Sequence, residues 1–337
     1  MQQYYDKYSS YPPGFDPYPE EKKRQKKELF QIGSFVGAAL LAFLMLQNIV
    51  VMLLMIVGLY KKYLNDALFQ TGIEILSSVF CILLPFVFFG RIISKRYTGA
   101  EILPLEKPKD TTLSVFAVPF GVGLCMAANI VTSYLIVFMG LFGVKLSSPE
   151  MLRVDGFAGF LLSVIQVSVA AALVEEISLR GSVMQNLRKY GDTFAVVMSA
   201  VVFGIMHMNL VQAPFAMIVG LGLGFITVKT GSIWPAIVVH AINNFFSTVI
   251  TYLPQWGVDE KAVNIIYSLA LYAFLGLGVV FGYFFIRRAG RISPYQNNGS
   301  VLTTGEKAKA FLLSPTILIA MLVMLYYTAQ YVGLMQR

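Results

Sequence analysis

The sequence predicts an all-α, polytopic membrane helical bundle of about eight or nine transmembrane helices. Its 337 residues are 57% hydrophobic and only 13% charged, and the mean hydropathy is +0.68. Soluble proteins carry roughly 25% charged residues. Several apolar runs reach the roughly 20 residues that a helix needs to cross the hydrocarbon core. These observations exclude a soluble globular domain.

Nine apolar runs set the organisation of the chain. A Tyr- and Pro-rich polar tail at 1–30 has little to pack and is expected to be a disordered cytosolic segment. N-terminal helices follow at 31–110, a core at 111–287, and a polar connection with a final helix at 288–337. The first and last spans are expected to be the least tied to the rest. The predicted spans are 31–60, 69–90, 112–142, 158–188, 193–210, 213–229, 233–253, 263–286 and 310–334.

The basic residues indicate the orientation. If all nine spans cross, 20 of the 26 Lys and Arg residues lie on the side of the N-terminus and six lie on the other side. Cytosolic loops carry the excess of Lys and Arg. The N-terminus is therefore expected to be cytosolic, in a bacterial plasma membrane. The same distribution accounts for the net charge of +8 without a nucleic-acid partner.

The fourth span carries two adjacent carboxylates, in the segment VEEISLR at 174–180. Charged side chains at membrane depth are costly and mark functional sites. Glu176 and Arg180 are four residues apart, so they share a helical face and are predicted to pair. Glu175 points about 100° away, which leaves its carboxylate available as a general acid or base. Taken alone, the segment also fits an ordinary charged helix end.

Both histidines of the chain lie in apolar runs. His207 follows Phe203 by four residues in the fifth span, and His240 precedes Asn244 by four residues in the seventh. A single histidine in an apolar helix is usually a satisfied core residue. Here both histidines of the chain lie in apolar helices, one has an Asn at helical spacing, and a Glu pair lies elsewhere. Together these features favour a functional site.

The depths of these residues allow them to meet. If the fourth span continues to about Arg188, Glu175 and His207 each lie about 20 Å from the cytosolic end of their helix. His240 and Asn244 lie about 10 to 17 Å from theirs. The motifs are therefore expected to share one cavity, open toward the cytosolic side.

Three motifs thus stand in order within predicted membrane helices: EExxxR from Glu175, FxxxH from Phe203 and HxxxN from His240. Together they resemble the CPBP family, which takes in the type II CAAX prenyl endopeptidases and the bacterial Abi-type membrane proteases. The GSIWPAI run before His240 is also similar to that family. The resemblance covers about residues 112–286 and implies about eight membrane helices.

The resemblance implies endopeptidase activity on peptides near the membrane. Amide hydrolysis needs a base beside a water molecule and donors aimed at the developing oxyanion, and the residue types agree. By position, the implied roles are water activation by Glu175 assisted by His207, oxyanion stabilisation by His240 and Asn244, and support of the site by Glu176, Arg180 and Phe203.

A metal is the open question of this site. Glu175, His207 and His240 would make a His₂Glu zinc set. However, the sequence has no HExxH motif, and a Glu used as a ligand would leave only Glu176 as the base. A site without metal or cofactor is therefore favoured, with Zn²⁺ as the alternative.

Two other functions compete with the protease. A non-catalytic regulator would hold a partner such as a sensor kinase. Such a protein does not need the motif residues, so the fact that all of them are present here argues against it. A transporter would use Glu and His as a proton relay, but no internal repeat or paired broken helices are visible. The expected partners are the lipid bilayer and a peptide or membrane-protein substrate. Prenylated C-termini, bacteriocin or pheromone leader peptides and membrane-protein tails all fit.

Overall fold

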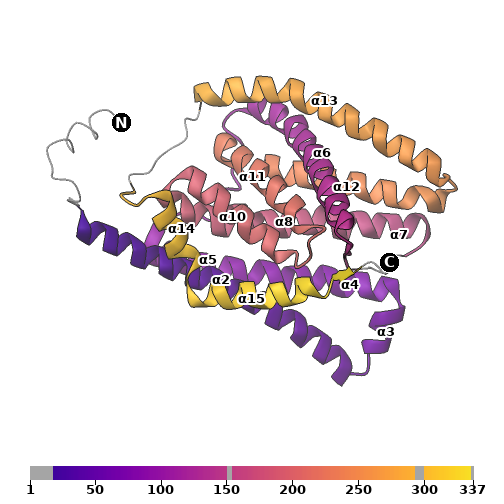
Figure 1. Cartoon of the computed structure of the whole chain (residues 1–337), viewed down its shortest axis with the longest axis horizontal. Helices are drawn as coiled ribbons and strands as arrows, with labels where there is room; N and C mark the ends of the chain where they lie inside the picture. The colour runs from indigo at the N-terminus through magenta and orange to yellow at the C-terminus, as the bar shows by residue number, and fades with distance from the viewer. Residues whose placement is uncertain (1–17, 150–153, 293–299, 335–337) are drawn as a thin grey trace.

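The computed structural model describes residues 18–149, 154–292 and 300–334 (Figure 1). These residues form helices with one pair of short strands, which confirms the all-α class. The α-helices are α2 (Pro19–Ile56), α3 (Tyr60–Asn65), α4 (Ala67–Ser77), α5 (Leu84–Ile93), α6 (Thr111–Leu141), α7 (Gly156–Ser163), α8 (Ala171–Glu176), α9 (Met184–Leu187), α10 (Asp192–Met206), α11 (Ala213–Thr230), α12 (Trp234–Tyr252), α13 (Glu260–Ile292), α14 (Thr304–Leu312) and α15 (Pro315–Ala329).

Shorter elements join these helices. The π-helical turns are η1 (Ser78–Leu83), η2 (Ser94–Thr98), η3 (Val164–Ala170) and η4 (Ile177–Val183), and the 3₁₀ turns are η5 (Arg188–Tyr190) and η6 (Leu253–Trp256). The strands are β1 (Val144–Leu146) and β2 (Val332–Leu334), which pair antiparallel. Because η1, η3 and η4 continue neighbouring α-helices, several of the short helices are parts of longer rods.

The protein is an integral membrane protein. In the described part of the chain, seven helices are long and apolar enough to cross a membrane, or eight if the bent pair α14 and α15 is one span. The seven are Pro19–Ile56, Ala67–Thr98, Thr111–Leu141, Gly156–Tyr190, Ala213–Thr230, Trp234–Trp256 and Glu260–Gly290. The predicted fifth span is the 15-residue α10, about 22 Å long. The predicted ninth span is bent by 73° where α14 meets α15.

The helix α2 begins earlier than expected. Residues 1–17 of the predicted tail lie outside the described residues. From Pro19 onward the chain is helical, so the disorder predicted for 19–30 is wrong. Pro19 stands at the first helical position, where a missing N–H is tolerated, and Glu20 and Glu21 favour the positive end of the helix dipole.

The first and last spans pack on each other and share one hydrophobic core with residues of α5 and α10, so the expectation that they are the least tied to the rest is not met. α15 runs alongside α2 (Figure 1), and both contribute to one hydrophobic core. Glycines allow this approach. A Cβ atom added to Gly37 would lie 2.3 Å from the backbone nitrogen of Ile317, and one added to Gly33 would lie 2.3 Å from the carbonyl oxygen of Phe311.

The bundle has two ends, which matter for the site. The N-terminal end is the one where α2 begins, and the opposite end carries α3 and the strand pair (Figure 1). Ion pairs join separate helices at the N-terminal end. Lys189 Nζ lies 2.7 Å from Glu28 Oε2, and Arg288 Nε lies 2.6 Å from Asp110 Oδ2.

Candidate functional site

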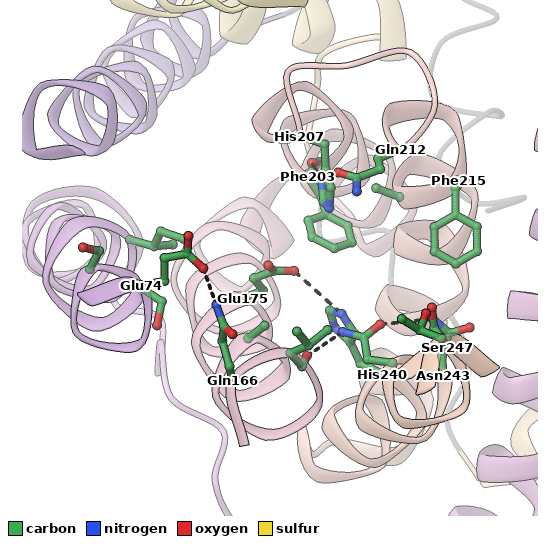
Figure 2. A pocket seen from close by; sticks show the side chains of 18 of the residues that line it. Glu74, Gln166, Glu175, Phe203, His207, Gln212, Phe215, His240, Asn243 and Ser247 are labelled. Atoms are coloured by element: carbon green, nitrogen blue, oxygen red, sulfur yellow. Dashed lines mark hydrogen bonds and ion pairs between the residues drawn. The ribbon is translucent and has the colours of Figure 1, made fainter. Parts of the chain in front are cut away.

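One cavity of about 850 Å³ is lined by residues of α2 to α4 and of α8, α10, α11 and α12. All four predicted catalytic side chains line its wall, although they come from three separate helical segments. Figure 2 shows Glu175, His207 and His240. They are Glu175, His207, His240 and Asn244. The expectation that the three motifs share one cavity is therefore met in the structure.

The two glutamates lie in one long helical rod, Gly156–Tyr190, which continues past Arg188 as the depth estimate assumed. The π-helical turns η3 and η4 flank the short α8 that carries both glutamates. Such wider turns change which side chains face a given direction, and they occur often at functional sites. Glu175 is 20% exposed and faces the cavity, whereas Glu176 is completely buried.

The buried Glu176 connects Arg180 with His240. Its Oε1 accepts a hydrogen bond from Arg180 Nη1 at 3.0 Å, which confirms the predicted pair. The same oxygen lies 2.9 Å from His240 Nδ1. Because a carboxylate only accepts, Nδ1 carries the proton and donates it. His240 Nε2 is then turned toward the other glutamate, 3.7 Å from Glu175 Oε2 (Figure 2).

The ring of Phe203 packs against Arg180 and both histidines. The Arg180 guanidinium carbon lies 4.6 Å from the centre of this ring, within the range of a cation–π contact. The centroids of the His207 and His240 rings lie 4.9 and 6.0 Å from it, both edge to face. Phe203 therefore contacts the buried guanidinium and both imidazoles.

A local turn holds His207 at the end of α10. Its Nδ1–H donates to the carbonyl of Phe203 at 2.9 Å, so neutral His207 keeps a lone pair on Nε2. The next residue, Met208, has a left-handed backbone with φ of 52°, which is uncommon for a residue other than glycine. The buried amide of Asn209 stabilises the turn by donating to the His207 carbonyl at 2.7 Å and accepting from the Gln212 backbone at 2.8 Å.

The amide of Asn244 is oriented by two contacts. Its Nδ2 donates to the carbonyl of Val167 in η3 at 2.9 Å, and its Oδ1 accepts from Asn243 Nδ2 at 3.2 Å. Since the amide nitrogen has two N–H groups, one remains for another acceptor. Sequence reasoning missed Asn243 and Asn209 as positioning residues. Both stand directly beside or near predicted site residues in apolar surroundings, which is the signal that would have found them.

Sequence reasoning also missed Glu74. It lies within the predicted span 69–90 and lines the same cavity. Its Oε2 accepts a hydrogen bond from Gln166 Nε2 at 2.5 Å (Figure 2). The signal was present in the sequence, because a carboxylate inside a long apolar helix is unusual.

The side chains of the zinc alternative do not form a ligand set. Within the described ranges, no three His, Cys, Asp or Glu side chains are grouped as the ligands of a metal ion would be. Glu175, His207 and His240 line one cavity, and His240 donates from Nδ1 to Glu176 while its Nε2 faces Glu175. The metal-free site and the zinc alternative both stay predictions.

The cavity extends from the middle of the bundle toward the end remote from the N-terminus. Its lining includes Leu54 near the end of α2, Tyr63 in α3, Glu74 in the first half of α4 and Thr251 near the end of α12. All these positions lie toward the opposite end. The orientation of the N-terminus and the side of the membrane to which the cavity opens stay predictions.

Comparison with known proteins gives one match. Residues 157–246 match the family model described as type II CAAX prenyl endopeptidase Rce1-like. This segment is narrower than the predicted 112–286, but it contains the motifs from Glu175 through Asn244. No curated protein and no solved structure matches the chain.

Proposed function

We propose, starting from the match of residues 157–246 to the family model of type II CAAX prenyl endopeptidases, that this chain is an intramembrane endopeptidase. It would hydrolyse a peptide bond of a membrane-associated peptide or protein. The observation that carries this proposal is the convergence of Glu175, His207, His240 and Asn244 on one cavity. A base and hydrogen-bond donors in one partly enclosed space are what amide hydrolysis requires.

Glu175 would hold the attacking water and take its proton. The oxygen of that water then adds to the carbonyl carbon of the scissile bond. His207 would assist, because its Nε2 lone pair can accept the second hydrogen of the same water. As the carbon–nitrogen bond breaks, the proton on Glu175 passes to the leaving amine nitrogen.

His240 and Asn244 would stabilise the negative oxygen of the intermediate. The two ring nitrogens of His240 face carboxylates, at 2.9 Å for Nδ1 and 3.7 Å for Nε2. Because Nδ1 donates to Glu176, donation from Nε2 to the oxyanion requires the doubly protonated imidazolium. Asn244 would add its remaining N–H. The contacts from Glu176, Arg180 and Asn243 hold these donors in place, so little reorganisation is needed during the reaction.

Cleavage without a metal is the first prediction. The purified chain in mild detergent is expected to cleave members of a quenched peptide pool, followed by mass spectrometry, equally with and without a chelator. His207→Ala is expected to lower kcat about a hundredfold or more, the range for losing one acid–base group. Glu101→Gln, at an exposed carboxylate outside the cavity, is the matched control. Chelator-sensitive cleavage would support the zinc alternative, and lack of cleavage by the wild type would count against a protease.

We also propose that the N-terminal end is cytosolic and that the cavity opens toward the other face of the membrane. The charge of the described residues supports this orientation, because cytosolic segments are rich in Lys and Arg. The basic residues at the N-terminal end include Lys22, Lys23, Arg24, Lys26, Lys27, Lys95, Arg96, Lys107, Lys109, Lys189, Arg287 and Arg288. The opposite end has Lys61, Lys62, Lys145 and Lys261. Substrates would then reach the site from the extracytosolic half of the bilayer.

Labelling of single cysteines tests this orientation. Cys81 and Cys125 are replaced by alanine, and one cysteine is introduced at Lys145 beside the strand pair or at Lys109 at the N-terminal end. Both lysines are exposed. In intact bacterial cells, a membrane-impermeant maleimide is expected to label Lys145→Cys and not Lys109→Cys until the cells are opened. The reverse pattern would place the cavity on the cytosolic half.

A further inference from the structure

We propose that Glu74 forms a second subsite of the cavity, which binds a cationic group of the substrate. The group would be a Lys or Arg side chain close to the scissile bond. This inference rests on the proposed protease function and specifies its substrate class. It is carried by the position of Glu74, by its neutral partners and by its relation to Glu175.

The position of Glu74 is costly for a charge. It lies in the apolar span Ala67–Thr98, which has a mean hydropathy of 2.2 over its most apolar window. Seven residues separate it from Ala67, about 10 Å of helix from the opposite end of the bundle. Ionisable side chains at such depth usually face a protein interior and serve binding or proton transfer, and Glu74 faces the cavity.

The partners of Glu74 are neutral. Gln166 donates to Oε2, whereas the Tyr63 hydroxyl lies 3.5 Å from Oε1, which is long for an O–H···O hydrogen bond. Among the described side chains, no Lys, Arg or His forms an ion pair with Glu74. One carboxylate oxygen is thus anchored, while the other has no short hydrogen bond and remains able to accept one from a ligand.

The cavity walls near Glu74 suit a long basic side chain. Apolar side chains of α2 and α4 line this part of the cavity, among them Val50, Val51 and Ile73. The methylene stems of Lys and Arg pack on such surfaces while the charged head reaches a polar partner. An apolar environment also strengthens the attraction between the cation and the carboxylate.

The helix that carries Glu175 sets the distance between the two subsites. Gln166, which holds Glu74, precedes Glu175 by nine residues on one rod, so about 13 Å separates them along the axis. An extended peptide covers that length with about four residues. In Figure 2, Glu74 and Gln166 lie on one side of Glu175, whereas His240 and Asn243 lie on the other. A peptide crossing the cavity would therefore place a residue within about four positions of the scissile bond beside Glu74.

A peptide series tests this subsite. An apolar 12-residue peptide carries Lys, norleucine or Glu at each of the four positions on either side of its cleavage site. For each variant, the measured quantity is the ratio of kcat/KM for the Lys peptide to that for the norleucine peptide. In the wild type this ratio is expected to reach about 30 at one position, the lower range for a buried charge pair. It is expected to fall to about 1 in Glu74→Gln, and Glu74→Lys is expected to prefer the Glu peptide.

Two controls separate this inference from the proposed function. Glu101→Gln is expected to keep the wild-type ratio. Binding of the same fluorescent peptides to Glu175→Gln reports the Lys preference even without turnover. A wild type that prefers Lys at none of the eight positions would overturn the inference, and so would a preference that survives Glu74→Gln. Glu74 and Gln166 would then be a structural contact between α4 and η3. Loss of the Lys preference alone leaves the protease proposal intact, because that proposal depends on Glu175.

Discussion

Glu175→Gln is expected to abolish peptide cleavage, with kcat lowered at least about a thousandfold, within the range for loss of a general base. Glutamine has nearly the same shape but cannot take a proton from water. Glu175 is partly exposed to the cavity and lies 3.7 Å from His240 Nε2, so the substitution leaves no buried charge without a partner. The thermal unfolding midpoint in detergent is therefore expected to stay close to that of the wild type.

The measurement is single-turnover cleavage of the best peptide, followed by mass spectrometry. Glu101→Gln removes a carboxylate of the same kind outside the cavity and is expected to cleave at the wild-type rate. If Glu175→Gln retained more than about a tenth of the activity, the assignment of the base would be wrong. If it lost activity together with folding, the comparison of unfolding midpoints would reveal it.

Arg180→Met is expected to destabilise the folded protein by about 3 to 5 kcal/mol and to inactivate it. Removing one partner of a buried ion pair leaves the other charge uncompensated, and such changes have costs of this size. Here the remaining charge would be Glu176, which is completely buried and shares its Oε1 with His240. Glu176→Gln is expected to act in the same direction, because the guanidinium of Arg180 would then be buried alone.

The double variant Glu176→Gln with Arg180→Met distinguishes this explanation from a general packing defect. Arg180 Nε and Nη2 and Glu176 Oε2 find no hydrogen-bond partner within the described structure, so the pair is imperfectly satisfied. Replacing both charges by neutral groups of similar size is often tolerated. The double variant is therefore expected to be more stable than either single variant, yet inactive, since His240 loses its carboxylate partner. Additive losses of stability, measured by denaturant unfolding in micelles, would contradict the ion-pair account.

Much of the fold was predictable because hydropathy and helix length are local properties. A run of apolar residues at 112–142 predicts a crossing helix wherever its neighbours lie, and α6 occupies Thr111–Leu141. The prediction failed where contacts between separate helices determine the structure. The charged residues after Pro19 resemble a disordered tail in isolation, but α2 continues through them and Glu28 pairs with Lys189. The short α10 is as apolar as a membrane-spanning helix, but it is shorter than one.

In the site, too, contacts within one helix were predictable and contacts between helices were not. Helical spacing by itself predicted the pair of Glu176 and Arg180, since residues four apart always meet on a helix. The order of the motifs also predicted which residues line the cavity. By contrast, the contact of Glu176 with His240 joins residues 64 positions apart. Gln166 and Glu74 are 92 positions apart.

The sequence by itself therefore determined that this protein crosses the membrane with many helices, that it carries the motifs of a CPBP-type protease, and which side of the bundle is basic. Only the tertiary structure decided which nitrogen of His240 faces Glu175, that Glu74 shares the cavity, and that the cavity extends toward the end of the bundle opposite the N-terminus. The physical reason is that composition and spacing act within one helix. The direction of a side chain into a shared cavity depends on how separate helices pack, and their wider π-helical turns alter that direction locally.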